Sequence, residues 1–124
     1  MTSHVLIVDP DPYAAHVTRA IVARTAPEAD FEVAATPEVA LRVMERATPD
    51  VLIIDPAPQS PSARDLIAGL KLQHPEVRVV VLASAPTPNL RRAMEKLGVD
   101  VYLEKPVPFP RFVEELRAMI ATMN

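Results

Sequence analysis

Three charged residues follow apolar segments of this chain, and their types could take part in phosphoryl transfer. Asp9 follows the apolar run 5–8 and Asp55 follows the run 51–54, while Lys105 comes directly after the segment "VYLE". An aspartate carboxylate can act as a nucleophile and form an acyl-phosphate. That reaction uses Mg²⁺, held by one or two carboxylates, and a lysine can supply further positive charge. Each residue alone is also typical of a polar loop cap, but their joint placement favours a site.

Short apolar runs predict the strands that must position these residues. The runs at 5–8, 51–54 and 79–82, with a weaker one at 101–103, each indicate a strand buried on both faces. The segment "FEVA" from Phe31 alternates more between apolar and polar residues. We interpret it as an edge strand.

Prolines mark the starts of several predicted helices. Asp11, Thr36 and Thr87 are predicted N-caps, each followed by a proline at the first helical position. Gly98 is the predicted C-cap of the fourth helix. Gly69 lies inside the third, at a cost of up to ~1 kcal/mol relative to alanine, and we interpret it as allowing close packing. The helices are expected at about 12–26, 37–47, 62–73 and 88–97, and from about 112 to the end of the chain. Their inward-facing apolar residues are expected to be Ala14, Val17, Ile21, Val39, Ala40, Val43, Met44, Ala47, Leu66, Ile67, Leu70, Leu90, Met94, Leu97, Phe112, Val113, Leu116, Met119 and Ile120.

Strands and helices that alternate along the chain predict an α/β fold. Strands buried on both faces indicate a parallel sheet with helices on either side. In such a sheet the carboxyl ends of all strands open on one edge, where ligands bind. We therefore expect the side chains that follow the strands to converge there. At 124 residues, the chain has the length of one domain, 1–124, either as a protein by itself or as part of a longer one.

Composition excludes several classes of function. A net charge of -3 and 4% aromatic residues argue against direct nucleic-acid binding. With 2 glycines there is no glycine-rich loop for nucleotide phosphates, and without cysteine there is no thiolate chemistry. The apolar runs are too short to span a membrane, and the first residues lack a signal-peptide pattern. We expect a cytoplasmic protein that is not an enzyme and binds no cofactor other than Mg²⁺.

The whole chain resembles the receiver domain of two-component response regulators, the CheY-like family. The resemblance rests on "VLIVDPDP", "PDVLIIDPAP", "VVVLASA" and "LGVDVYLEKPV" at successive strands. It implies a flavodoxin-like α/β/α sandwich with a five-stranded parallel sheet of order 2-1-3-4-5 and five helices. By this resemblance Asp55 is the phosphoacceptor, Asp9 and Asp55 hold Mg²⁺, and Lys105 senses the phosphoryl group. The same resemblance assigns Pro106 as a cis-proline and Tyr102 as the aromatic switch residue.

Two positions depart from the pattern of that family. Pro10 stands where a second metal-binding acid is usual, so the site loses one negative charge and Mg²⁺ binding is predicted to weaken ten-fold or more. Asp11 could replace that acid, although its interpretation as a helix cap is favoured. Ala83 stands where a threonine or serine is usual. Ser84 is adjacent, but its hydroxyl could replace the missing one only through a local bend, because successive strand residues point to opposite faces. Without that hydroxyl, Tyr102 has no obvious means of sensing phosphorylation of Asp55.

The loop after Asp55 contains three prolines. Pro56, Pro58 and Pro61 predict a stiff loop that is poorly suited to switching.

The face formed by the fourth helix, fifth strand and fifth helix resembles the partner surface of the family. It is expected to bind a histidine kinase, another signalling protein or a second copy of the chain, with candidate contacts Leu90, Arg91, Met94, Glu95, Phe109 and Arg111. Core packing or simple solvation is an equally strong interpretation for each of these six.

Three functional hypotheses remain open. The favoured one is an atypical receiver with an impaired magnesium and phosphoryl site that acts by docking a partner protein. The second is a conventional receiver phosphorylated on Asp55 by a histidine kinase. The third, more remote, is a flavodoxin-like domain that binds a flavin or another small ligand at the same sheet edge.

Overall fold

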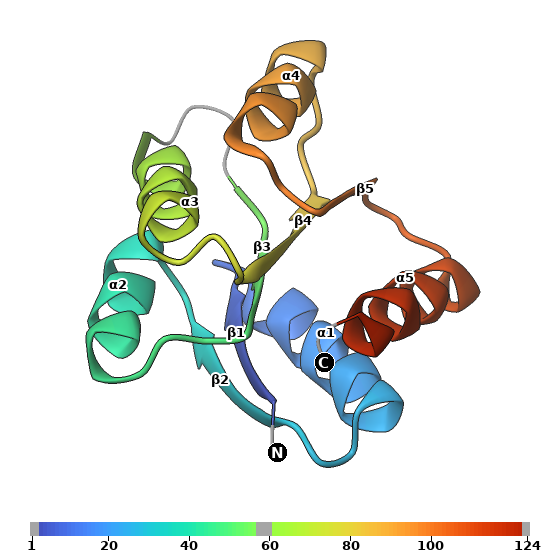
Figure 1. Cartoon of the computed structure of the whole chain (residues 1–124). Coiled ribbons are helices and arrows are strands. Elements are labelled where there is room, and N and C mark those ends of the chain that lie inside the picture. Colours follow the sequence, from blue (N-terminus) through green and yellow to red (C-terminus); the bar gives the residue numbers. More distant parts are fainter. Residues whose placement is uncertain (1–2, 57–60, 123–124) are drawn as a thin grey trace.

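Five parallel strands form the central sheet of the computed structural model, which describes residues 3–56 and 61–122 (Figure 1). Their order in the sheet is β2-β1-β3-β4-β5, as the family resemblance implies. The segment from Phe31, which is expected to form an edge strand, lies within Asp30–Ala34, at one edge of the sheet. The strands are β1 (His4–Val8), β2 (Asp30–Ala34), β3 (Val51–Ile54), β4 (Arg78–Ala83) and β5 (Val101–Glu104).

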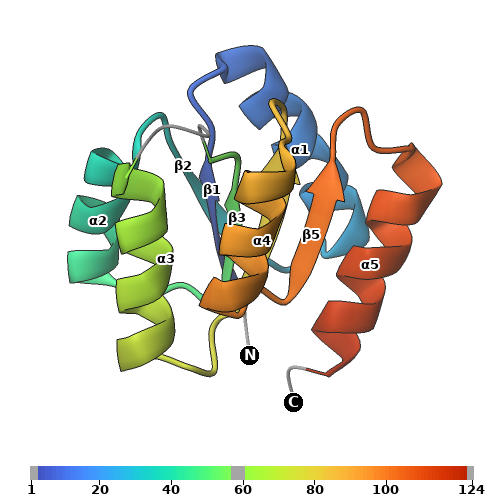
Figure 2. The ribbon, with the colours of Figure 1, turned by 90° about the horizontal axis from the view of Figure 1, so that it is seen from above.

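Helices cover both faces of this sheet, which confirms the predicted three-layer α/β/α architecture. One face is covered by α1 (Pro12–Thr25) and α5 (Phe109–Ala121). The other is covered by α2 (Pro37–Arg46), α3 (Pro61–Gln73) and α4 (Pro88–Leu97), as Figure 2 shows from a second direction. No helix within the described residues has both the length and the apolar composition needed to cross a membrane.

The predicted caps define the helix ends. The Asp11 carboxylate accepts hydrogen bonds from the first turn of α1, and the Thr36 and Thr87 side chains accept from Val39 N and Leu90 N. These bonds satisfy amide groups that have no partner inside the helix. Gly98 ends α4 in the left-handed conformation, with φ of 79°, which glycine adopts without a steric penalty.

The core consists of one apolar cluster on each face of the sheet. Alternating strand residues divide between them, because successive side chains point to opposite faces. Thus Leu6 and Val8 pack with α2, α3 and α4, whereas Val5 and Ile7 pack with α1 and α5. This alternating burial specifies the register of the strands, because a shift by one residue would turn every side chain to the opposite face.

The inward faces of two helices differ from the prediction. In α1 the buried residues are Ala15, Thr18 and Val22, one position beyond the predicted stripe, and Val17 is 39% exposed. In α2, Val39 is also 39% exposed and Ala47 lies outside the helix and is exposed. Each further residue turns the side chain by about 100° around a helix, and apolar residues occur on more than one face of these two. Contact with the sheet, rather than the apolar pattern, therefore decides which stripe is buried.

Gly69 also differs from its interpretation as a close-packing residue. A Cβ atom added at this position would meet no atom within 4 Å outside its own helix backbone. The space beside Gly69 is open, so packing does not require a glycine here.

Candidate functional site

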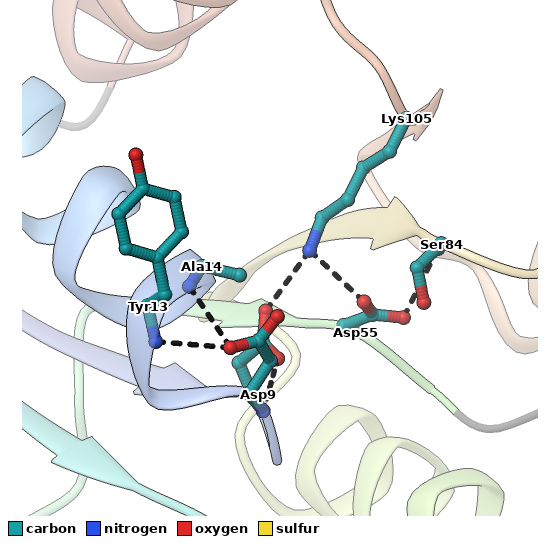
Figure 3. Close-up of polar contacts among 7 residues, drawn as sticks. Asp9, Tyr13, Ala14, Asp55, Ser84 and Lys105 are labelled. Carbon is teal, nitrogen blue, oxygen red and sulfur yellow. Dashed lines mark hydrogen bonds and ion pairs between the residues drawn. The ribbon is translucent and has the colours of Figure 1, made fainter.

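Asp9, Asp55 and Lys105 meet at the carboxyl edge of the sheet, as their positions after three strands predict. Asp9 and Asp55 follow the adjacent strands β1 and β3, and Lys105 follows β5. Figure 3 shows the ammonium of Lys105 pointing between the two carboxylates. The three residues thus form one cluster, although up to 96 positions separate them in the sequence.

Lys105 bridges the two carboxylates at hydrogen-bond distance. Its Nζ lies 3.0 Å from Asp9 Oδ2 and 3.0 Å from Asp55 Oδ2. The side chains of Asp9 and Asp55 are 5% and 6% exposed, and that of Lys105 is 23% exposed. Burial by itself lowers the pKa of Lys105, but the hydrogen bonds and negative charges of Asp55 and Asp9 outweigh it and raise this pKa above its ordinary value. Lys105 is therefore a stably charged ammonium.

Backbone amides hold the two remaining carboxylate oxygens. Asp11 N donates to Asp9 Oδ1 at 2.9 Å, and Ser84 N donates to Asp55 Oδ1 at 3.2 Å. Each of the four carboxylate oxygens consequently accepts a hydrogen bond from a described residue. With two carboxylates and one ammonium, the cluster carries one net negative charge.

Pro10 leaves a gap in the acidic set that Asp11 does not fill in this structure. The Asp11 Oδ1 atom accepts from Tyr13 N at 3.0 Å and from Ala14 N at 3.5 Å. This is the N-cap of α1, the favoured interpretation of this residue. The Asp11 carboxylate thus serves the helix, while its backbone amide serves Asp9.

The end of β4 contributes a backbone amide to the site. Ala83 is fully buried within the apolar cluster that α4 covers. Ser84 is exposed, and its backbone amide, rather than its hydroxyl, is the group that contacts Asp55. Sequence reasoning considered only the Ser84 side chain. The amide contact could have been predicted, because β3 and β4 are neighbours in the sheet and the residues that follow them lie side by side.

Tyr102 lies half-buried on β5 and is held by two charged neighbours. Its hydroxyl donates to Glu104 Oε2 at 3.3 Å, and the Arg91 guanidinium lies 5.8 Å from its ring centroid. Burial, followed by the charge and hydrogen bond of Glu104, raises the pKa of Tyr102, and Arg91 opposes this. The contacts with Glu104 and Arg91 were not predicted from the sequence.

Two of the six candidate partner contacts are core residues. Leu90 and Met94 are 0% exposed, so the expectation that they contact a partner is wrong; they face the sheet because they form the buried stripe of α4. Arg91, Glu95, Phe109 and Arg111 are exposed.

The peptide bond between Lys105 and Pro106 is cis. Part of the loop predicted to be stiff, 57–60, lies outside the described residues.

The carboxylates of Asp9 and Asp55 are the groups that could hold Mg²⁺. Magnesium binds in proteins through one or two carboxylates and keeps several of its waters. Two carboxylates therefore fit the ion, but they are few ligands for it. Among the described residues, no group of three or more His, Asp or Glu side chains is arranged to hold a metal. When bound there, magnesium would neutralise the charge of a transferring phosphoryl group.

Comparisons with known proteins identify the family of the chain. Residues 5–117 match the family model described as the response regulator receiver domain. No curated protein sequence matches the chain.

Solved structures with the same fold come from several organisms. A CheY-like receiver domain protein from Methanospirillum hungatei is 19% identical, with a TM-score of 0.86 over 99% of this chain and 97% of that one. The receiver domain of a two-component histidine kinase from Clostridium thermocellum is 20% identical, with a TM-score of 0.85 over 97% and 98%. With the family match over residues 5–117, the sheet order and the Asp9–Lys105–Asp55 cluster, the chain belongs to the receiver-domain family of response regulators.

Proposed function

We propose that this receiver domain relays signals by docking a partner protein in one constant state, with an impaired magnesium and phosphoryl site. The observation that carries the proposal is the set of hydrogen bonds to all four oxygens of Asp9 and Asp55. Lys105 occupies, as an internal cation, the space between the two acids. The acidic cluster is therefore satisfied without a metal ion.

Weak magnesium binding follows from the charges of this cluster. Asp9 and Asp55, the residues that would hold Mg²⁺, are both paired with Lys105, and Pro10 supplies no third carboxylate. At an effective dielectric constant near 20, a unit charge at ~4 Å is worth about 4 kcal/mol. Even a third of that amount lowers affinity by about ten-fold.

Ala83 supports a constant state rather than a switch. Ala83 has no hydroxyl that could bond to a phosphoryl group on Asp55, and its methyl group is buried in the apolar cluster that α4 covers. The Tyr102 hydroxyl also donates a hydrogen bond to Glu104, so Glu104 orients the Tyr102 side chain independently of Asp55. Among the described residues, neither Ala83 nor Tyr102 therefore has a contact that would transmit a change at Asp55 to the face of α4, β5 and α5.

The second candidate is conventional phosphorylation of Asp55 by a histidine kinase, and the Lys105–Asp55 contact favours it. In that reaction an Asp55 oxygen attacks phosphorus, the phosphorus–nitrogen bond of phosphohistidine breaks, and the imidazole leaves. Lys105 is placed to pair with the new phosphoryl oxygens. Phosphorylation and partner docking are therefore to be measured in the same protein.

The test treats the wild type and the variant Pro10→Asp/Ala83→Thr with acetyl phosphate and Mg²⁺ and measures intact mass. We expect one phosphoryl group on the double variant and none, or a slowly formed minor fraction, on the wild type. Asp55→Asn in the double variant should abolish the addition. Ready modification of the wild type, with a change in partner affinity, would overturn the proposal in favour of conventional phosphorylation.

A further inference from the structure

A hollow on the face of α4, β5 and α5 carries more positive than negative charge. It has a volume of about 400 Å³, and its lining includes Arg91 on α4, Tyr102 and Glu104 on β5, and Arg111 on α5. Pro106 and Pro108 also line it, and their fixed φ angles give it a stiff wall. With two guanidiniums and one carboxylate, the lining has a net charge of +1.

The single acid of this hollow is already engaged. Glu104 accepts the hydrogen bond of the Tyr102 hydroxyl at 3.3 Å. Arg91 pairs through Nε with Glu95 at 3.2 Å, and both side chains are about 60% exposed. A guanidinium has five N–H donors, so this one contact leaves Arg91 with donors to spare. Within the described part of the chain, no ion pair or hydrogen bond involves the Arg111 guanidinium.

Tyr102 orients one of the two arginines. The Arg91 guanidinium lies 5.8 Å from the centroid of the Tyr102 ring, within the range of a cation–π contact. This contact and the Glu95 pair restrict the Arg91 side chain before anything binds. The hollow therefore presents two guanidinium groups. That of Arg91 is restrained, and that of Arg111 has no partner among the described residues.

We propose that this hollow binds a carboxylate side chain from an acidic segment of the partner protein, held by Arg91 and Arg111. The inference rests on the proposed docking function and specifies the chemistry of the partner. Planar guanidinium groups match carboxylate oxygens in a bidentate geometry. An exposed site of this kind gives modest affinity and strong dependence on charge.

Two other occupants fit the charges less well. A nucleic-acid backbone needs an extended cationic surface, whereas the chain has a net charge of -3. In a symmetric dimer through this face, the same patch meets itself. Arg111 would then approach a second cationic hollow, while Glu95 and Glu104 are occupied within their own chain.

The test is a titration of the ¹⁵N-labelled wild type with a short glutamate-rich peptide with blocked termini, without Mg²⁺ or phosphodonor. The matched glutamine-rich peptide is the neutral control. We expect saturable shifts of amide and arginine Nε–H signals around Arg91, Tyr102 and Arg111. Arg91→Gln and Arg111→Gln should each weaken binding by about three- to ten-fold, and added salt should weaken the wild-type complex.

Arg92→Gln is the matched variant, because Arg92 lies on the same helix, donates to Asn89 and does not line the hollow. It should bind the peptide within about two-fold of the wild type. Equal losses in all three variants, equal binding of both peptides, or shifts at another surface would overturn the proposal. So would sedimentation showing a wild-type dimer that Arg111→Gln dissociates, since the occupant would then be a second copy.

Failure of this inference is separable from failure of the proposed function. If the peptide binds only after acetyl phosphate and Mg²⁺ modify Asp55, the hollow is correct and the constant docking state is wrong. If no peptide binds in either state while intact mass shows an unmodified wild type, the hollow is wrong and the impaired phosphoryl site stands.

Discussion

Lys105 Nζ lies 3.0 Å from Asp9 Oδ2, between residues that are 96 positions apart. The Asp9 side chain is 5% exposed, and an unpaired charge at such a position would be costly. Lys105 pairs with Asp55 at the same distance. One ammonium therefore compensates two buried acids, and the stability of the fold is coupled to the residue that the family resemblance assigns to phosphate sensing.

Replacing this ammonium should destabilise the protein and strengthen metal binding. Lys105→Met leaves two buried carboxylates without a cation, so we expect a loss of about 1–3 kcal/mol in the free energy of unfolding at neutral pH, less than for a fully buried pair. Mg²⁺ should then stabilise the variant more than the wild type, measured as a shift in Tm. Lys96→Met, at an exposed position of α4, is the control. An unchanged stability for Lys105→Met would contradict the role of Lys105 as an internal cation.

Asp11 should behave as a helix cap and not as a metal ligand. Asp11→Ala removes the acceptor for Tyr13 N and Ala14 N, so unfolding in urea should show a loss of about 1 kcal/mol. Asp11→Ser, which retains a capping oxygen, should restore most of it. Mg²⁺ affinity, measured by calorimetry, should be nearly the same in all three proteins. A marked loss of affinity in both variants would identify Asp11 as the missing acid.

The raised pKa of Tyr102 should be visible in an alkaline titration. In Tyr13→Phe, Tyr102 is the remaining tyrosine, and the ultraviolet absorbance of tyrosinate should give a midpoint above the ordinary value of about 10. Burial and Glu104 favour the neutral phenol. Its contribution to stability is therefore complete below pH ~10 and is lost as the pH rises through the folded pKa. Adding Glu104→Gln should lower the midpoint, and no change would show that Glu104 does not act on Tyr102.

Two leucines of opposite burial provide a test of the α4 packing. Leu90 is 0% exposed and Leu72 is 83% exposed. Leu90→Ala should cost about 2–5 kcal/mol because it leaves a cavity in the core, whereas Leu72→Ala should change stability by no more than about 0.5 kcal/mol. Chemical denaturation measures both. Similar values for the two would contradict the assignment of Leu90 to the core.

The two glycines should respond oppositely to alanine. Gly69 lies inside α3 with open space where an alanine Cβ would lie, while Gly98 has φ of 79°. Gly69→Ala should stabilise the protein by up to about 1 kcal/mol, because alanine is the better helix former. Gly98→Ala should destabilise it by about 1 kcal/mol, because an L side chain strains the left-handed conformation. Thermal unfolding of both variants tests the pair, and a shift in the same direction would contradict it.

Much of the fold was predictable from the sequence because the signals are local. A cap such as Asp11 or Thr87 bonds to amides two or three residues away, so its partner is close in the sequence. Strand ends are equally local, since the apolar run before Asp9 or Asp55 stops at the acid. Topology then places all such ends at one edge of a parallel sheet.

Contacts between distant residues were decided only by the tertiary structure. Strand order brings the Ser84 amide to Asp55 and one ammonium to two acids. The sheet selects Thr18, rather than Val17, for burial. By itself, the sequence determined which groups end each strand and begin each helix, because these depend on neighbouring residues. Their pairing and burial depend on packing across the sheet, where residues remote along the chain become neighbours.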